Sequence, residues 1–278
     1  MLLIKTFHFS RLAIWTLFGG LGLMSMPVFS AENKLSMTGS STVAPLALEI
    51  AKRFESQNPG VRIDVQTGGS GRGIADARNG TADVGLVSRS LKADESDLQG
   101  HTIALDGVAV ILHKSNPVGN LSNAQIVGIY TGTIQNWKEV GGKDQKITVV
   151  NKAEGRSTLE LFAQYFGLKN SQIKAQVVIG DNQQGIKTVA GNPGAIGYVS
   201  IGSAEFEIEN GVPLKMLSMN GVKPNTENVR NGSFPLSRPL LLVTKGVDTD
   251  LRKKFLSFSK SPAVYDLVKE QYFVPIGR

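Results

Sequence analysis

The chain has 278 residues, a formal net charge of +7 and no cysteine. This length suffices for two modest α/β domains with apolar cores, and the lack of cysteine excludes disulfides and a lipid-bearing cysteine. The positive residues are scattered apart from Arg252-Lys253-Lys254, which disfavours a nucleic-acid surface and is typical of a protein that attracts small anions.

The first thirty residues have the pattern of a secretory signal. Lys5, His8 and Arg11 make the start basic, and residues 12–26 are apolar and uncharged. That run is about 15 residues long, shorter than the roughly 20 that a membrane-spanning helix needs. We therefore predict a cleavable signal peptide over residues 1–30 and a periplasmic protein; a membrane anchor is the alternative.

The first half of the chain alternates strands with helices. In order, a strand, a helix, a strand, a helix and a strand are predicted over residues 35–37, 43–57, 61–65, 74–79 and 83–87. Two further strands, 102–105 and 108–113, are expected to join at Asp106-Gly107.

The second half repeats this alternation. Helices are predicted over residues 123–130, 158–166 and 185–190, and strands over 147–150, 177–179 and 194–199. A late strand at 239–244 returns the chain to the first unit, and two helices follow at 250–259 and 262–271. We expect an α/β protein of two lobes with mixed, mostly parallel sheets and a cleft between the lobes. The expected lobes are 31–112 with 239–278, and 113–238.

Three clusters rich in Ser, Thr and Gly precede predicted helices, at residues 39–42, 67–73 and 154–158. A helix N-terminus presents unpaired N–H groups and a partial positive charge, so it can bind an anion. Ordinary helix caps and a flexible turn are the alternatives. Because all three clusters follow predicted strands, they indicate a site for a small oxyanion.

Signatures of enzymes and cofactors are scarce. The Gly-rich loop fails the dinucleotide pattern, since Ile74 occupies the third glycine position after Gly69. His101 and His113 lack the spacing of metal ligands, and no Gly-x-Ser-x-Gly elbow is present. We expect no cofactor, no metal and no catalysis, with a phosphoryl-transfer enzyme as the alternative.

Asp106 is a candidate for anion selectivity. A carboxylate beside a hydroxyl-rich cleft can accept the proton of hydrogen phosphate, whereas fully ionised sulfate would meet repulsion. A purely structural role in a turn with Gly107 is the alternative.

Several motifs together resemble a known family. They occur in one order at residues 38–45 (TGSSTVAP), 68–73 (GGSGRG), 82–89 (ADVGLVSR), 106–110 (DGVAV) and 194–199 (GAIGYV). This order resembles the periplasmic phosphate-binding proteins of phosphate-specific ABC transporters. Residues 129–137 (IYTGTIQNW) look like that family's helix and Trp turn. The resemblance extends from about residue 36 to residue 272.

The resemblance implies a fold and a function. The fold would be that of a two-lobed type II periplasmic binding protein that closes on one dehydrated phosphate. The partners would be inorganic phosphate and an inner-membrane ABC permease, with no nucleic acid, and the protein would be a monomer. Because the chain departs from the family at two positions, another tetrahedral oxyanion is the alternative ligand.

The same resemblance assigns site residues. Lys152 stands where the family has Arg, and we favour Arg156 as the cation that contacts phosphate. Ser88-Arg89 stands where the family has an acidic ligand, so the acceptor role passes to Asp106. The candidate phosphate-binding residues are Ser40, Ser41, Thr42, Ser70, Ser88, Asp106, Arg156, Ser157 and Thr158, with Gly69, Arg89 and Lys152 as further candidates.

Overall fold

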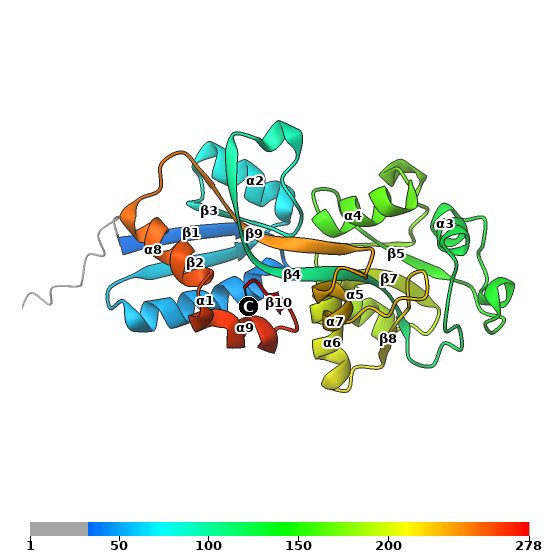
Figure 1. Ribbon diagram of the computed structural model, residues 1–278. Coiled ribbons are helices and arrows are strands. Elements are labelled where there is room, and N and C mark those ends of the chain that lie inside the picture. The colour runs from blue at the N-terminus through cyan, green and yellow to red at the C-terminus, as the bar shows by residue number, and fades with distance from the viewer. Residues whose placement is uncertain (1–32, 278) are drawn as a thin grey trace, which may run out of the picture.

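The computed structural model describes residues 33–277, which form two α/β lobes side by side (Figure 1). The signal peptide predicted over residues 1–30 lies outside the described residues. Within the described part, no helix is both long and apolar enough to cross a membrane.

The first lobe contains strands β1 (Lys34–Gly39), β2 (Arg62–Thr67), β3 (Val84–Val87) and β10 (Val274–Pro275). Its helices are α1 (Val43–Gln57), α2 (Ser70–Asn79), α8 (Asp250–Ser259) and α9 (Tyr265–Glu270). Figure 1 shows α1 and α9 on one side of this part of the sheet and α2 on the other.

The second lobe contains strands β5 (Thr148–Lys152), β6 (Val177–Ile179), β7 (Ala195–Ser200) and β8 (Leu214–Met216). Its helices are α3 (Asn123–Thr131), α4 (Ser157–Phe166), α5 (Asn182–Ala190), α6 (Ile201–Glu209) and α7 (Thr226–Arg230). Strand β8 and helices α6 and α7 were not predicted from the sequence.

Two long strands, β4 (Leu98–His113) and β9 (Ser237–Lys245), connect the lobes (Figure 1). The sheet order is β2-β1-β3-β9-β4-β7-β5-β6. The outer pairs β1–β2, β1–β3, β5–β6 and β5–β7 are parallel, whereas every antiparallel pair involves β4 or β9. The late strand predicted at 239–244 is β9, and it returns the chain to β3 as expected.

The turn expected at Asp106-Gly107 is wrong, because β4 passes through both residues without a break. Here β4 pairs with β9, and Asp106 lies opposite Arg238. A glycine is needed at position 107 for close packing and not for a turn, since a Cβ there would lie 2.6 Å from Ile201 Cδ1. Long-range strand pairing thus overrides the local turn signal of an Asp-Gly pair.

The predicted Gly-rich loop is also shorter than expected, since α2 begins at Ser70 and not near residue 74. Gly73 lies inside the helix, where a Cβ would come within 2.7 Å of Leu86 O and 2.8 Å of Thr38 O. This glycine allows α2 to pack directly on β1 and β3. The start of α2 is thereby held at the ends of these strands.

Each lobe has its own apolar core. In the first, the apolar face of α1 packs on the sheet, as its spacing predicted. In the second, Phe162 of α4 stacks on Tyr198 of β7, with ring centroids 4.0 Å apart and planes 5° apart. Such a pair contributes roughly 0.5–1.5 kcal/mol beyond its burial. These contacts fix α4 with its N-terminus toward the first lobe.

Candidate anion-binding site

The three Ser/Thr/Gly clusters meet around one small cavity between the lobes. Only about 10 Å³ is open to the centre of a water-sized sphere, which is room for about one water molecule, so the cavity excludes any large ligand. The lining residues are Ser40, Ser41, Thr42, Gly69, Ser70, Ser88, Lys152, Arg156, Ser157, Thr158 and Gly180. The structure thus brings together all the predicted site residues except Arg89 and Asp106, and adds Gly180.

Helices α2 and α4 point N-termini without capping side chains at this cavity, although Gly71 N in the first turn of α2 donates to Gly155 O. The residues that precede them, Gly69 and Arg156, make no side-chain cap hydrogen bond. In contrast, α3, α5, α6, α7 and α8 each have a capping side chain. At α1, the Ser40 hydroxyl accepts from the N–H groups of Thr42 and Val43. The first turns of α2 and α4 are therefore suited to hold an anion.

The hydroxyl of Ser157 is the clearest indication of a ligand-binding position. Its Oγ is buried and has no hydrogen-bond partner among residues 33–277. An unpartnered buried polar group costs about 1–3 kcal/mol, so native proteins rarely contain one without a functional reason. An anion in the cavity would accept this hydrogen bond.

A buried arginine lies directly behind the cavity, and the sequence analysis did not predict it as a site residue. Arg238 of β9 is 3% exposed, and its Nη1 donates to Thr158 Oγ1 at 3.0 Å and to Ser88 Oγ at 3.3 Å. Its Nη2 donates to Thr42 Oγ1 at 3.2 Å. The guanidinium thus orients three cavity hydroxyls and adds positive charge behind them.

Asp106 holds this arginine in place. Its Oδ2 accepts from Nε and Nη2 of Arg238 at 3.1 and 2.9 Å, and its Oδ1 accepts from Gly202 N at 3.3 Å. Asp106 does not line the cavity. The position of Asp106 therefore does not support the prediction that its carboxylate contacts the proton of a bound phosphate.

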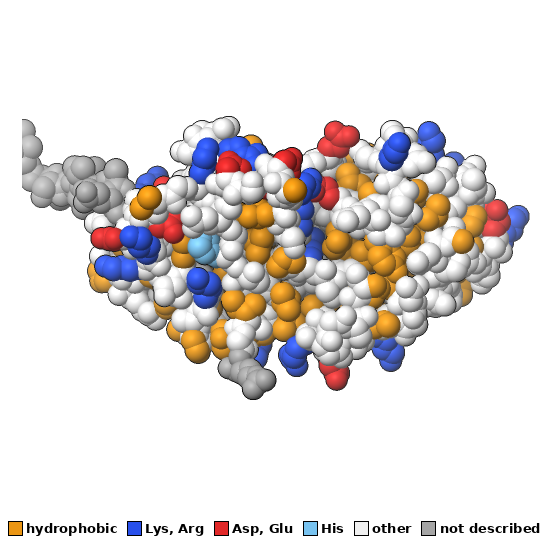
Figure 2. Space-filling view, turned by 45° about the horizontal axis from the view of Figure 1, so that its top comes forward, with side chains coloured by type: hydrophobic (Ala, Val, Ile, Leu, Met, Phe, Trp, Pro, Cys, Tyr) orange, Lys and Arg blue, Asp and Glu red, His pale blue; other side chains and the backbone are white. Residues whose placement is uncertain are grey.

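Arg89 also lies away from the cavity. It donates to both carboxylate oxygens of Glu95 at 2.7 Å, and its Nε lies 2.9 Å from Glu160 of α4. Lys92 Nζ lies 2.9 Å from the same Glu160 oxygen. Because Glu160 belongs to the second lobe, these ion pairs hold the two lobes together. Figure 2 shows Lys and Arg side chains in the furrow between the two halves of the molecule.

Two cations line the cavity itself. Lys152 is 2% exposed, and its Nζ donates to Asn182 Oδ1 at 3.0 Å. Arg156 spans the opening between the lobes: a Cβ on Gly69 would lie 2.8 Å from its Cδ, and one on Gly180 3.5 Å from its Nη2. None of the described residues that line the cavity is acidic. The charge of the site therefore favours an anion.

Gly69 allows the close approach of the two lobes. Its φ of +94° suits only glycine, and an added Cβ would lie 2.9 Å from Gly155 O as well as near Arg156. We expect Gly69→Ala to weaken anion binding roughly tenfold or more, because the backbone strain and the clash both oppose closure. Calorimetric titration measures this effect.

The matched control is Gly80→Ala at the other end of α2. Gly80 also has positive φ, +72°, but a Cβ there would meet no atom within 4 Å. This variant should lose thermal stability while keeping its anion affinity. Equal affinities of the Gly69 and Gly80 variants would contradict the role given to Gly69.

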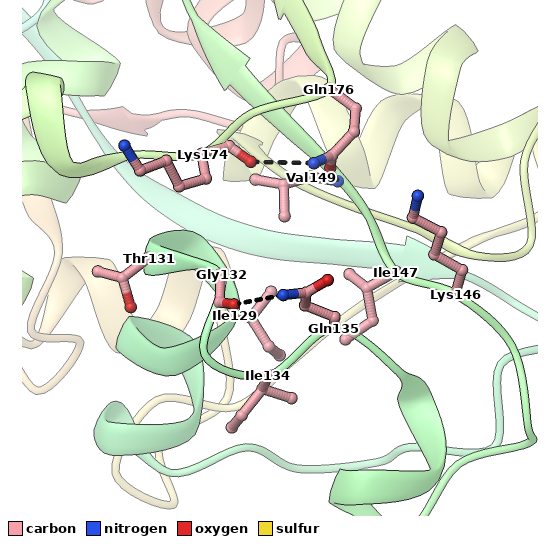
Figure 3. A pocket seen from close by; sticks show the side chains of 10 residues that line it. All are labelled: Ile129, Thr131, Gly132, Ile134, Gln135, Lys146, Ile147, Val149, Lys174 and Gln176. Atoms are coloured by element: carbon pink, nitrogen blue, oxygen red, sulfur yellow. Dashed lines mark hydrogen bonds between the residues drawn. The ribbon is translucent and has the colours of Figure 1, made fainter.

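A larger cavity lies in the second lobe, away from these loops (Figure 3). Its volume is about 330 Å³, and its walls include the apolar residues Ile129, Ile134 and Ile147. Lys146 and Lys174 lie on opposite sides of the opening, so their amines do not converge. This cavity is larger than the one between the lobes, but helix N-termini and buried hydroxyls favour the smaller one as the anion site.

Two α/β lobes around a hydroxyl-lined, positively charged cavity define a two-lobed anion-binding receptor. Comparison with known proteins agrees: residues 29–263 match a PBP superfamily domain. The phosphate-binding protein PstS of Bacillus subtilis is 34% identical over 252 residues, covering 88% of this chain and 82% of that protein. The chain belongs to this family of phosphate-binding PstS proteins.

Solved structures support the same assignment. A protein described as a phosphate ABC transporter substrate-binding protein from Clostridium perfringens, with bound phosphate, superposes with a TM-score of 0.81 at 34% identity. The match covers 88% of this chain and 100% of that one. An ABC-type phosphate transport receptor from Vibrio cholerae gives a TM-score of 0.71 at 32% identity, covering 86% and 99%.

Proposed function

We propose that this protein binds inorganic phosphate in the periplasm and delivers it to an inner-membrane ABC permease without changing it chemically. The observation that carries the proposal is the unpartnered Ser157 hydroxyl at the uncapped start of α4, inside a cavity that two cations line. The names of the related proteins support phosphate as the ligand.

In this proposal the phosphate oxygens accept hydrogen bonds from hydroxyls, helix N–H groups and cations. Ser41, Ser70 and Ser157 come from the starts of α1, α2 and α4. Arg156 supplies a planar, charged guanidinium, and Lys152 supplies a single amine. Because the site is buried, each of these interactions is stronger than it would be in water.

Closure of the lobes would signal the loaded state to the permease. Contacts already link the two sides: Gly71 N donates to Gly155 O at 2.9 Å, and Asn182 Nδ2 donates to Thr42 Oγ1 at 3.0 Å. We propose 31–112 with 239–278 as one moving body and 113–238 as the other. The proposed active form is a monomer, released after removal of residues 1–30.

A different tetrahedral oxyanion is the second candidate, because no acidic residue among the described ones lines the cavity. Phosphoryl transfer has less support. Within residues 33–277, no group of three His, Cys, Asp or Glu side chains is placed to hold a metal ion, and the related proteins are named for binding.

Calorimetry with phosphate, sulfate, arsenate and molybdate at pH 8 tests the proposal. Phosphate should bind one-to-one in the low micromolar range or tighter. Sulfate should bind at least about tenfold more weakly, a difference of about 1.4 kcal/mol. No heat with phosphate, or equal affinity for phosphate and sulfate, would overturn the assignment. Phosphate release from an ester substrate, with or without divalent metal, would support the enzyme alternative.

Asp106→Asn separates the two roles considered for this carboxylate. Because Asp106 binds Arg238 and not the cavity, we expect the phosphate-to-sulfate affinity ratio to stay within about threefold of the wild-type value. Both affinities should move in the same direction. A drop in phosphate affinity together with a rise in sulfate affinity would show that Asp106 accepts the phosphate proton. Thermal unfolding controls for a loss of fold.

A further inference from the structure

Lys152 is an unusual cation for a buried site. It ends β5 in the interior of the molecule. Within the described residues, no carboxylate lies at salt-bridge distance from its Nζ, and its one hydrogen-bond partner is the neutral amide of Asn182. A buried ammonium without a carboxylate is costly. The free protein can lower this cost by releasing the proton.

Taken together, the groups that face Lys152 favour this release. They are Arg238 of β9, Arg156 before α4, Asp181 and Asn182 at the start of α5, and Tyr198 of β7, whose hydroxyl accepts from Lys152 N. Burial, followed by the charges of Arg238 and Arg156, lowers the pKa of Lys152 to about 7, although Asp181 opposes the shift. Near neutral pH, the amine is therefore uncharged in a large fraction of the molecules.

Hydrogen phosphate brings a hydroxyl proton into the cavity, and that proton needs an acceptor. The nearby acids are occupied: Asp106 binds Arg238, Asp181 accepts from Gln184 N at 2.8 Å, and Glu154 accepts from Asn170 at 2.9 Å. None of the three lines the cavity. Lys152 does line it, and an uncharged amine has a free lone pair.

We propose that the uncharged amine of Lys152 accepts the hydroxyl proton of bound hydrogen phosphate and so distinguishes phosphate from sulfate. This inference rests on the proposed function. One N–H of the amine donates to Asn182 Oδ1, the lone pair accepts the phosphate O–H, and the second N–H donates to another phosphate oxygen. If the proton crosses to nitrogen, the pair becomes an ammonium and a phosphate trianion, with the same total charge.

Sulfate has no proton to give, so it must bind the ammonium form of Lys152. Above pH 7, each bound sulfate therefore takes one proton from solvent, and its affinity should fall by up to about tenfold per pH unit. Hydrogen phosphate bound to the uncharged amine takes up no proton, so its affinity should stay constant above pH 7. The phosphate-to-sulfate affinity ratio should thus rise with pH.

The test is calorimetric titration of the wild type with phosphate and with sulfate at pH 6.5, 7.5 and 8.5. The ratio should rise by about tenfold between pH 7.5 and 8.5. Parallel changes for the two anions, a sulfate affinity that does not change with pH, or no sulfate binding at millimolar concentration at pH 6.5 would each overturn the inference. If phosphate fails to bind at every pH, the proposed function fails instead.

Variants assign the effect to this residue. Lys152→Arg keeps the charge but has no lone pair, so its sulfate affinity should not depend on pH and its preference for phosphate should fall. Lys152→Met should also remove the pH dependence of sulfate binding. Lys146→Arg, at an exposed lysine of the same lobe, should behave as the wild type. A pH-dependent ratio that persists in Lys152→Arg would assign the proton to another group and overturn the inference.

Discussion

Replacing Arg238 with methionine is expected to lower the free energy of unfolding by about 3–5 kcal/mol and to reduce phosphate affinity at least about 100-fold. The side chains of Arg238 and Asp106 are each 1% exposed. The substitution therefore leaves a buried carboxylate without its partner. It also removes the donor that orients the hydroxyls of Thr42, Ser88 and Thr158. Denaturant unfolding and calorimetry measure the two losses.

A double variant separates folding from binding. Arg238→Met with Asp106→Leu removes both charges, and replacing a buried ion pair by apolar side chains is often neutral for stability. Stability should therefore recover while phosphate binding stays lost. Arg252→Met is the matched control, since Arg252 pairs with Asp248 at 2.6 Å and neither residue lines the cavity. The phosphate affinity of this variant should equal that of the wild type. Full phosphate affinity in the double variant would contradict the role of Arg238.

Replacing Arg156 with alanine is expected to weaken phosphate binding by about 2 kcal/mol or more, close to 30-fold. Arg156 lines the cavity and lies between Gly69 of one lobe and Gly180 of the other. Its loss removes a charged, planar fork from a closed site. Lys152→Ala should cost less affinity, because a single amine makes fewer hydrogen bonds to the anion than a guanidinium with its five N–H donors.

Arg72→Ala provides the control for a general effect of charge. Arg72 lies in the same Gly-rich segment but pairs with Asp76 at 3.0 Å and is half-exposed. Its removal should leave phosphate affinity nearly unchanged. If Lys152→Ala weakens binding more than Arg156→Ala, Lys152 is the main contact to the anion, and our preference for Arg156 is wrong.

Local patterns in the sequence predicted the elements that form the cavity. The apolar spacing of residues 43–57 predicted α1 with its observed bounds, and the same holds for α8 at Asp250–Ser259. Ser, Thr and Gly at the starts of helices indicated the anion site, because the need to satisfy the first N–H groups depends on a few neighbouring residues. The cavity therefore contains ten of the twelve candidate residues.

Local patterns of this kind do not predict which strands pair when they lie far apart in the sequence. Arg238 is the second residue of β9 and lies one residue before the strand predicted at 239–244. Its role arises only because β9 pairs with β4, which places Arg238 opposite Asp106. The same pairing turned an expected turn at Asp106-Gly107 into continuous strand. Arg89 likewise faces Glu95 and Glu160 instead of the cavity. Its contact with Glu160 depends on how the second lobe packs against the first, which local patterns do not predict.

The most direct test of the central claim is a crystal structure of the protein grown with inorganic phosphate. We predict one phosphate in the cavity between the lobes, within hydrogen-bond distance of Ser157 Oγ, the first N–H groups of α4, Ser70 at the start of α2, and Arg156. Phosphate bound elsewhere, such as beside Lys146 and Lys174 in the larger cavity of the second lobe (Figure 3), with the cavity between the lobes left empty, would contradict the account.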